Sequence, residues 1–428
     1  MKHFLPLIFV ASLIFPSAAP AAVSDEDIQE LRSQLATLSQ RLEELAAENA
    51  ELRQAQEKSA TAIADVEMTV ADMPAASESW SDRIVLDGDF RYRYEWIDPE
   101  GSSTRNRNRI RARTNIKAQV SDDVEVGFGL ATGGDDPVST NQTLGGGGSS
   151  KSIVLNLAYA DWEVTDGLHV IGGKFKNPLT RVGGQPFTWD GDWTPEGLAL
   201  NYKRDWFFVN AIGSFLESDT RKSNDMFAFG GQFGATGNLG DVKLTGGIGY
   251  YSIPTAGNTT TFGDPTDPGD FFGNTAVEES GLPCGTTPDE TCVYLYDYDL
   301  TQVFAEASFD VGDWPMLVFL DYVNNSDASD NNTGWSVGTK IGQTRDRGQI
   351  QFTYYYADKE ADSMLGLVTD SDFGGGGTDR RGHWLQFNYG ISKSWTVGAQ
   401  YFINEVDLAT GNKSDYNRLM IDMQWKWK

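Results

Sequence analysis

The chain has 428 residues and a formal net charge of −27, which excludes nucleic acid as the main partner because phosphate binding requires a basic surface. Its mean hydropathy of −0.39 does not exclude a membrane protein, since the strands of a membrane β-barrel are only half apolar. The 12 Trp, 16 Tyr, 23 Phe and 46 Gly suit a large barrel with aromatic girdles and glycine-rich turns.

Residues 1–21 have the pattern of a secretory signal peptide. A basic start is followed by an apolar run from Phe4 to Phe15 and by an Ala-x-Ala site that ends at Ala21. The apolar run is shorter than the roughly 20 residues that span a bilayer. We therefore expect export and cleavage after Ala21 or Ala22.

Residues 25–73 carry a heptad repeat that predicts an α-helical coiled coil in the periplasm. Two core positions recur over about six heptads, and they hold Ile28, Leu35, Leu42, Asn49, Gln56, Ile63 and Val70, and Leu31, Leu38, Leu45, Leu52, Ser59 and Val66. An isolated helix cannot bury such a seam, so the pattern indicates oligomerisation. The alternative is a monomeric helix that folds back on its own domain.

From residue 80 to residue 428 the sequence predicts strands and turns. Between Arg105 and Val120, basic and polar residues alternate with apolar ones, and the segment from Ile84 to Trp96 alternates in the same way. Successive side chains of a strand point to opposite faces. One charged face and one apolar face with aromatic ends indicate a membrane β-barrel strand, with lipid outside and a wet lumen inside.

We expect sixteen strands, over residues 82–96, 105–120, 123–133, 151–164, 168–176, 196–203, 205–217, 225–236, 240–253, 299–312, 314–325, 333–343, 347–358, 381–392, 394–406 and 416–427. Tight turns alternate with long polar loops, which is typical of outer-membrane barrels. The long loops cover residues 133–150, 177–195, 253–298 and 358–380. The predicted fold is all-β: a 16-stranded antiparallel transmembrane β-barrel after an N-terminal coiled-coil segment. Segments 151–164 and 205–217 are apolar on both parities, which indicates a subunit contact or misplaced boundaries.

No motif predicts an enzyme, a cofactor site or a metal site. The segment Gly334–Gly338 matches G-x-S-x-G but lacks the strand–turn–helix context of a nucleophile. His169 and His383 are far apart and have no metal-ligand spacing. In an exported protein, Cys284 and Cys292 are expected to form one disulfide within a polar loop.

The residues that we expect to line a channel form a basic ladder on the charged face of the first two strands. They are Arg91, Arg93, Arg107, Arg109, Arg111, Arg113 and Lys117. The third loop on the long-loop side of the barrel, from Lys176 to Glu196, carries Asp190, Asp192 and Glu196 among several aromatic residues. If it folds into the lumen, it narrows the pore and sets acid against base, so that a transverse field screens solutes. The alternative is a solvated wall in which the ladder pairs with Asp87, Asp89 and Glu95.

The chain resembles the sixteen-stranded putative porins of bacterial outer membranes, which are related to phosphate-selective porins. The resemblance rests on "LDGDFRYRYEW", on "RNRNRIRARTNIKAQVSDDVEVGFGLATG", on "GGKFKNPL" before the third loop and on the final "RLMIDMQWKWK". It implies a trimer of barrels, each with a water-filled channel that the third loop narrows. Phosphate-selective relatives have lysine-rich constrictions, whereas arginine dominates here, so phosphate selectivity is not expected.

The leading hypothesis is a passive channel for small hydrophilic solutes in the outer membrane of a Gram-negative bacterium. The expected partners are a homotrimer, outer-membrane lipid and lipopolysaccharide. The alternative is a structural anchor, in which the coiled coil tethers a closed barrel to the cell wall.

Overall fold

The computed structural model describes residues 80–218 and 225–428, together with residues 29, 33, 36, 39–41, 43, 45–58 and 61. The chain divides into two compact units, Met1–Glu78 and Ser79–Lys428. In the first unit, residues 45–58 are helical and their heptad residues Leu45 and Leu52 are exposed. The predicted signal peptide lies outside the described residues, and pairing of the helix in a coiled coil stays a prediction. None of the described helices combines the length and the apolarity needed to cross a bilayer.

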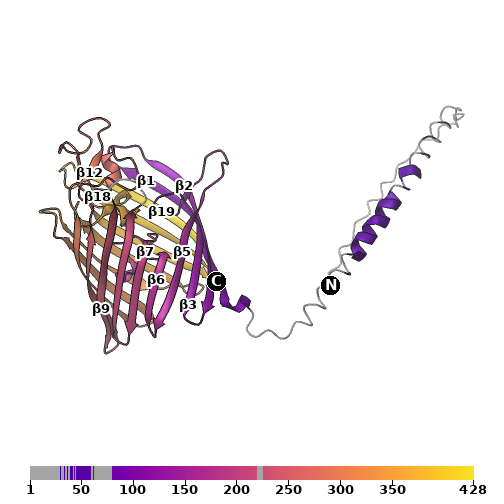
Figure 1. Cartoon of the computed structure of the whole chain (residues 1–428), viewed down its shortest axis with the longest axis horizontal. Helices are drawn as coiled ribbons and strands as arrows, with labels where there is room; N and C mark the ends of the chain where they lie inside the picture. The colour runs from indigo at the N-terminus through magenta and orange to yellow at the C-terminus, as the bar shows by residue number, and fades with distance from the viewer. Residues whose placement is uncertain are drawn as a thin grey trace, which may run out of the picture. The chain divides into compact units, whose positions relative to one another are not determined.

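The second unit is a closed antiparallel barrel (Figure 1). Its main sheet has 17 strands among the described residues, one of which, β4 (Gln142–Thr143), is a two-residue strand of a loop. β1 pairs with both β2 and β19, so the sheet has no free edge. The other sixteen strands are β1 (Ile84–Pro99), β2 (Arg105–Ser121), β3 (Val124–Thr132), β5 (Ile153–Thr165), β6 (Leu168–Lys174), β7 (Glu196–Arg204), β8 (Phe207–Glu217), β9 (Met226–Leu239), β10 (Val242–Ile253), β13 (Tyr298–Val311), β14 (Trp314–Asn325), β15 (Thr333–Gly342), β16 (Ile350–Lys359), β17 (Arg380–Ser392), β18 (Trp395–Val406) and β19 (Ser414–Trp427). The sixteen-stranded barrel predicted from the sequence is confirmed.

The period-two alternation sorts side chains between the two surfaces of the barrel. On β1, Arg93 and Glu95 point inward and are 2% and 0% exposed, whereas Leu86 is 51% exposed. On β2, Ile116 is 42% exposed, while Arg111 is buried. Apolar side chains therefore cover the outer surface, as hydrocarbon requires, and charged side chains occupy the interior.

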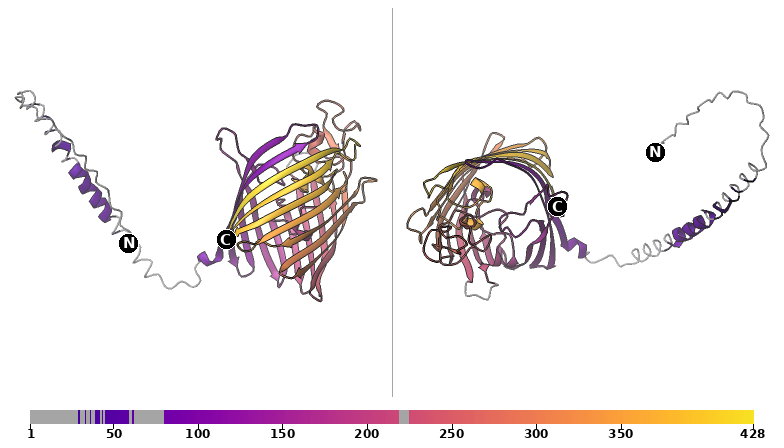
Figure 2. Two further views of the ribbon diagram at one scale, coloured as in Figure 1. Left: turned by 180° about the vertical axis from the view of Figure 1, so that it is seen from behind. Right: turned by 90° about the horizontal axis from the view of Figure 1, so that it is seen from above.

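The strand connections alternate between short turns and long loops, so the two ends of the barrel differ. We call the long connections loop L2 (133–152), loop L3 (175–195), loop L5 (254–297) and loop L7 (360–379). Figure 2 shows loop segments inside the ring of strands in the view along the barrel. Short 3-10 turns lie within three of them: η2 (Val182–Gly184) in L3, η3 (Pro268–Phe271) in L5, and η4 (Gly366–Val368) and η5 (Phe373–Gly375) in L7.

Loop L5 contains a hairpin of its own, built from β11 (Ala276–Glu278) and β12 (Cys292–Tyr294). A disulfide joins Cys292 of β12 to Cys284 in the segment between β11 and β12, with 5.6 Å between their Cα atoms. The bond closes a short segment of L5, and the disulfide within a polar loop that the sequence predicted is present.

One side of the barrel interior is a packed apolar core. Inward-facing aromatic residues of the wall, such as Phe208, Phe304 and Phe402, pack with buried residues of loops L3, L5 and L7. This core gives β8 its second apolar parity, because the inward Phe208 and Ile212 are buried within it rather than facing water. In β5 the cause is a β-bulge opposite Gly129 and Leu130, which inserts one residue and exchanges the faces of the strand.

Candidate functional site

The arginine ladder lies on the inner surface of β1 and β2, where antiparallel pairing stacks guanidinium groups closely. Arg91 is paired in register with Arg111, and Arg93 with Arg109. Strand neighbours are only about 4.8 Å apart. Such a cluster of like charges is stable only where carboxylates or water compensate it.

Three carboxylates of the barrel wall provide part of this compensation. Glu95, which is fully buried, lies 3.4 Å from Arg109 and 3.1 Å from Arg418, and it also accepts from Arg107. Asp89 accepts hydrogen bonds from Arg113 at 2.7 Å and from Arg111 at 2.9 Å. Asp422 of β19 accepts two hydrogen bonds from Arg93, at 2.7 and 2.8 Å.

Loops L3 and L7 supply two more carboxylates to the same ladder. Asp192 of L3 lies 2.8 Å from Arg113 and 3.4 Å from Arg111. Asp372 of L7 lies 3.0 Å from Arg93 and 2.8 Å from Arg418. Burial alone would raise the pKa of both carboxyls, but the neighbouring arginines outweigh it and hold each pKa below its ordinary value.

The two loops repeat one local motif, an Asp-x-Asp turn. In L3 the carboxylate of Asp190 accepts the backbone N–H of Asp192 at 2.6 Å, and in L7 that of Asp370 accepts the N–H of Asp372 at 2.8 Å. The second aspartate of each turn reaches the ladder, whereas the first is buried between the loops. The pKa of Asp190 is raised well above its ordinary value by burial and then by the adjacent carboxylates.

Direct contacts join loops L3 and L7. The backbone N–H of Asp190 donates to the carbonyl of Val368 at 2.8 Å, and the N–H of Ser371 donates to Oδ2 of Asp190 at 3.2 Å. Lys359, at the end of β16, places its Nζ 5.7 Å and 5.6 Å from the ring centroids of Phe187 and Phe373. Each loop therefore depends on the other for its position inside the barrel.

Aromatic packing fixes loop L3 against the wall formed by β8, β10 and β14. Trp189 stacks on Trp193 with 5.0 Å between ring centroids and meets the edge of Tyr251 at 4.9 Å. Gly183 has a φ of 59°, and its N–H donates to Glu306 at 2.9 Å. A Cβ at this position would lie 2.5 Å from the ring of Phe319, so this close approach requires glycine.

We therefore expect Gly183→Ala to loosen loop L3. Overpacking against Phe319 should weaken the folded loop by about 1–3 kcal/mol, seen as faster limited proteolysis within residues 175–195. Gly184→Ala is the matched control, because its φ of 61° carries the same strain but the nearest atom to the added Cβ is 3.8 Å away. Equal cleavage rates in the two variants would contradict this account of the anchor.

The structure brings together only some of the residues that the sequence nominated. Asp192 reaches the ladder, but Asp190 faces loop L7 instead. Glu196 is 61% exposed in its side chain and pairs with Lys174 at 2.7 Å. Lys117 lies 3.9 Å from Glu125, and Arg91 donates to the side chain of Asn141 at 2.6 Å. Whether these residues line a conducting path stays a prediction.

Sequence reasoning did not nominate three members of the charged cluster, Arg418, Asp422 and Asp372. The first two share the inward parity of the last strand, so the expected closure of the barrel against the first strand could have indicated them. Asp372 had only a weak signal, the Asp-x-Asp repeat shared by loops L3 and L7. Asp89 and Glu95 do pair with the ladder, as in the alternative of a salt-bridged wall.

Two water-accessible cavities lie on either side of this cluster. The outer cavity, about 680 Å³, is lined by residues of loops L2 and L5 and by the long-loop ends of strands. The inner cavity, about 940 Å³, is lined by the short-turn ends of β1 and β2 and by residues 393–394 and 426–428. The two linings share Asn156, Asp192 and Thr194. Loop L3 and the bulged segment of β5 therefore stand between them.

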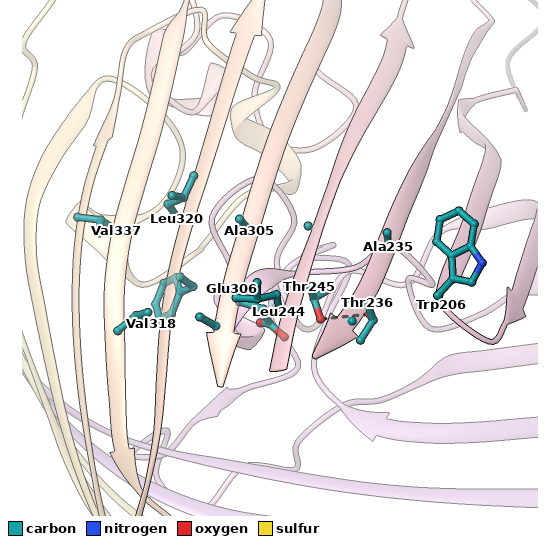
Figure 3. Close-up of a pocket in the computed structure, with 14 residues that line it drawn as sticks. Trp206, Ala235, Thr236, Leu244, Thr245, Ala305, Glu306, Val318, Leu320 and Val337 are labelled. Atoms are coloured by element: carbon teal, nitrogen blue, oxygen red, sulfur yellow. Dashed lines mark hydrogen bonds between the residues drawn. The ribbon is translucent and has the colours of Figure 1, made fainter. Parts of the chain in front are cut away.

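A third hollow, about 740 Å³ and almost wholly apolar, lies on the outer surface of the barrel (Figure 3). Small residues of β9, β10 and β13 form its floor, and exposed Trp206, Leu320 and Val337 stand at its rim. It faces away from the charged cluster and forms no part of it.

The described residues contain no group of three or more His, Cys, Asp or Glu side chains that could hold a metal ion. The carboxylates near the ladder are instead paired with arginine. Their arrangement can bind and orient ions and polar solutes through charge.

Comparisons with known proteins agree with the barrel architecture. A family model described as "putative porin" matches residues 96–260 and 289–427. The high-pH structure of Pseudomonas putida OprB has a TM-score of 0.54 at 12% identity, and the match covers 80% of this chain and 94% of that chain. This likeness shows the fold alone.

Two further structures are similar at lower scores. Salmonella typhi OmpF in complex with daunomycin has a TM-score of 0.47 at 11% identity, covering 80% of this chain and 97% of that one. The trimer form of Vibrio cholerae OmpT has a TM-score of 0.46 at 14% identity, covering 81% and 100%. A search of curated proteins finds no match.

Proposed function

We propose that this chain, which belongs to the family of putative porins, forms a water-filled channel for passive diffusion of small hydrophilic solutes and ions, narrowed by loop L3. The family and the barrel fold identify a protein of the bacterial outer membrane. The observation that carries the proposal is the pair of cavities that share Asn156, Asp192 and Thr194 in their linings. The narrowest part of the path is assigned to these residues and to the arginines that contact Asp192.

The charges at this narrow section can act on passing solutes because they are held in place on both sides. Asp192 stands on a loop anchored by aromatic packing, and Arg111 and Arg113 stand on a strand. Opposed acid and base create a transverse field, which orients dipolar solutes and disfavours apolar ones that would displace ordered water. The filter is therefore expected to select by polarity and size.

We infer three further features that complete this function. The N-terminal segment 1–21 is removed on export, residues 25–73 form a periplasmic coiled coil, and the barrels assemble as a homotrimer in contact with lipid and lipopolysaccharide. The exposed heptad leucines Leu45 and Leu52 support oligomerisation, because a single helix leaves this seam in water.

Planar-bilayer recording tests the channel directly. The purified full chain is expected to insert as units with three equal conductance steps, one for each barrel of a trimer. A protein that serves only as a tether would insert without steps. A single conductance step would support the channel and contradict the trimer.

The charge filter has its own test, the double variant Arg111→Gln with Arg113→Gln. Without these guanidinium groups, Asp89 and Asp192 lose their partners at the narrow section, and the reversal potential in a KCl gradient should shift towards cation preference. Arg345→Gln with Arg347→Gln is the matched control, because both residues are exposed in a short turn. An unchanged reversal potential in the first variant would remove Arg111 and Arg113 from the filter.

A further inference from the structure

The two cavities of the proposed channel carry opposite charge. Among the described residues that line the outer cavity, acidic ones dominate: one lysine, Lys174, lies with the carboxylates Asp135, Asp136, Asp192, Glu196 and Glu217. Basic residues dominate the inner cavity. Apart from the terminal Lys428 it holds Arg113, Lys117, Lys176, Arg181, Lys393 and Lys426, against Asp87, Asp89, Glu125 and Asp192.

Ion pairing does not cancel this difference. Lys174 neutralises Glu196 in the outer cavity, but the exposed Asp135 is in no ion pair with a described residue. In the inner cavity, Lys176 and Lys426 are exposed and have no carboxylate at salt-bridge distance in the described part of the chain. The side chain of Lys393 is 84% exposed, and its single ion pair among the described residues is a long one, 3.8 Å to Asp346. Mobile counter-ions must therefore balance both cavities.

We propose that the channel rectifies ion current, with higher conductance when its long-loop side is positive. The proposal rests on the function proposed above. Cations accumulate in the acidic cavity and anions in the basic one, because each fixed charge attracts its counter-ion within a Debye length. The narrow section at Asp192 is then a junction between a cation-rich and an anion-rich segment.

The direction of rectification follows from the order of these segments. With the long-loop side positive, cations are driven from the acidic cavity into the junction and anions are driven into it from the basic cavity. The junction fills with carriers of both signs, and conductance rises. With the opposite polarity, both carriers are withdrawn from the junction, and conductance falls. Residues Lys176, Lys393 and Lys426 thereby become determinants of permeation.

Single-channel recording of the full chain tests the proposal. In 0.1 M KCl, where the Debye length is about 10 Å, currents at opposite voltages of about 100 mV should differ by at least about 1.5-fold. In 1 M KCl, where the Debye length is about 3 Å, the ratio should approach one. The orientation of each channel is determined with Ser394→Cys, which lines the inner cavity, by the side from which a bulky impermeant maleimide reduces the current.

The triple variant Lys176→Glu, Lys393→Glu and Lys426→Glu makes both cavities acidic, so the current ratio should fall to about one while cation preference increases. Lys203→Glu, Arg204→Glu and Arg347→Glu is the matched control, since these exposed residues line neither cavity. Equal currents at both polarities in 0.1 M KCl would overturn rectification but leave the porin function intact. Absence of any current would overturn both. Rectification that persists in the triple variant or in 1 M KCl would overturn the charge mechanism.

Discussion

Glu95→Gln is expected to destabilise the barrel by about 3–5 kcal/mol, because the substitution leaves buried arginines without their shared partner. Glu95 is 0% exposed and serves Arg107, Arg109 and Arg418 together. The glutamine side chain has nearly the same shape as that of glutamate but carries no negative charge. Unfolding in guanidinium chloride, followed by the heat-dependent gel mobility typical of barrels, measures the difference in midpoint.

Glu405→Gln provides the control with the same chemical change. Glu405 also pairs with two basic residues, Arg381 at 2.7 Å and Lys413, but at a site where solvent screens the charges. The expected loss is no more than about 1 kcal/mol. If the two substitutions had equal effects, burial would not govern the charged cluster of β1, β2 and β19.

The second large effect is expected from Asp192→Asn with Asp372→Asn, which removes the carboxylates that loops L3 and L7 present to the ladder. Each charge contributes about 1 kcal/mol at a distance of 4 Å in water, with opposite sign for an anion and a cation. The loss of two charges therefore changes the relative free energies of anion and cation by about 2 kcal/mol or more, which corresponds to at least about a tenfold shift towards anion preference. The reversal potential in a KCl gradient reports this shift at neutral pH. Asp310→Asn with Asp313→Asn, at the turn between β13 and β14, should leave the reversal potential unchanged.

The same pair of residues determines the response to acid. The pKa values of Asp192 and Asp372 are lowered, so their contribution to stability is present above the ordinary value of 3.8 and is lost as the pH falls through the lowered pKa. The contribution of Asp190 to stability depends on pH in the opposite direction. Because its pKa is raised, it stabilises the folded loop in acid, and this contribution is lost as the pH rises through that pKa. The selectivity of the native protein should therefore persist to pH values below 4, and the double variant should lose the part of the acid response that Asp192 and Asp372 contribute.

The strands could be predicted closely because lipid on one face and water on the other require apolar and polar side chains to alternate every second residue. Residue parity separated Arg93 and Arg111 from Leu86 and Ile116 without any knowledge of tertiary contacts. The exceptions have local causes. β5 exchanges its faces at a bulge, and β8 turns apolar side chains inward because they are buried in the apolar core and not exposed to water.

The interior of the barrel could not be predicted to the same extent, because loop positions depend on contacts distant in sequence. Asp190 and Asp192 are indistinguishable in the segment Trp189–Trp193, yet one is buried against Val368 and Ser371 while the other reaches Arg113. Contacts with loop L7 determine which of the two aspartates is buried. This loop lies more than 170 residues later in the chain, and its sequence has no periodic pattern. The sequence could therefore predict that an acidic loop opposes the arginine ladder, but it could not predict which acidic residue contacts an arginine.

The seam between β1 and β19 joins charged residues from the two ends of the barrel sequence. Arg93 reaches Asp422, and Glu95 reaches Arg418, across a sequence separation of 329 residues for the first pair. A polypeptide that stops before β19 leaves Arg93 without Asp422 and Glu95 without Arg418. Such a fragment would also leave β1 and β18 with unpaired edges, because β19 pairs with both, and we expect it to be cleaved by proteases faster than the full chain.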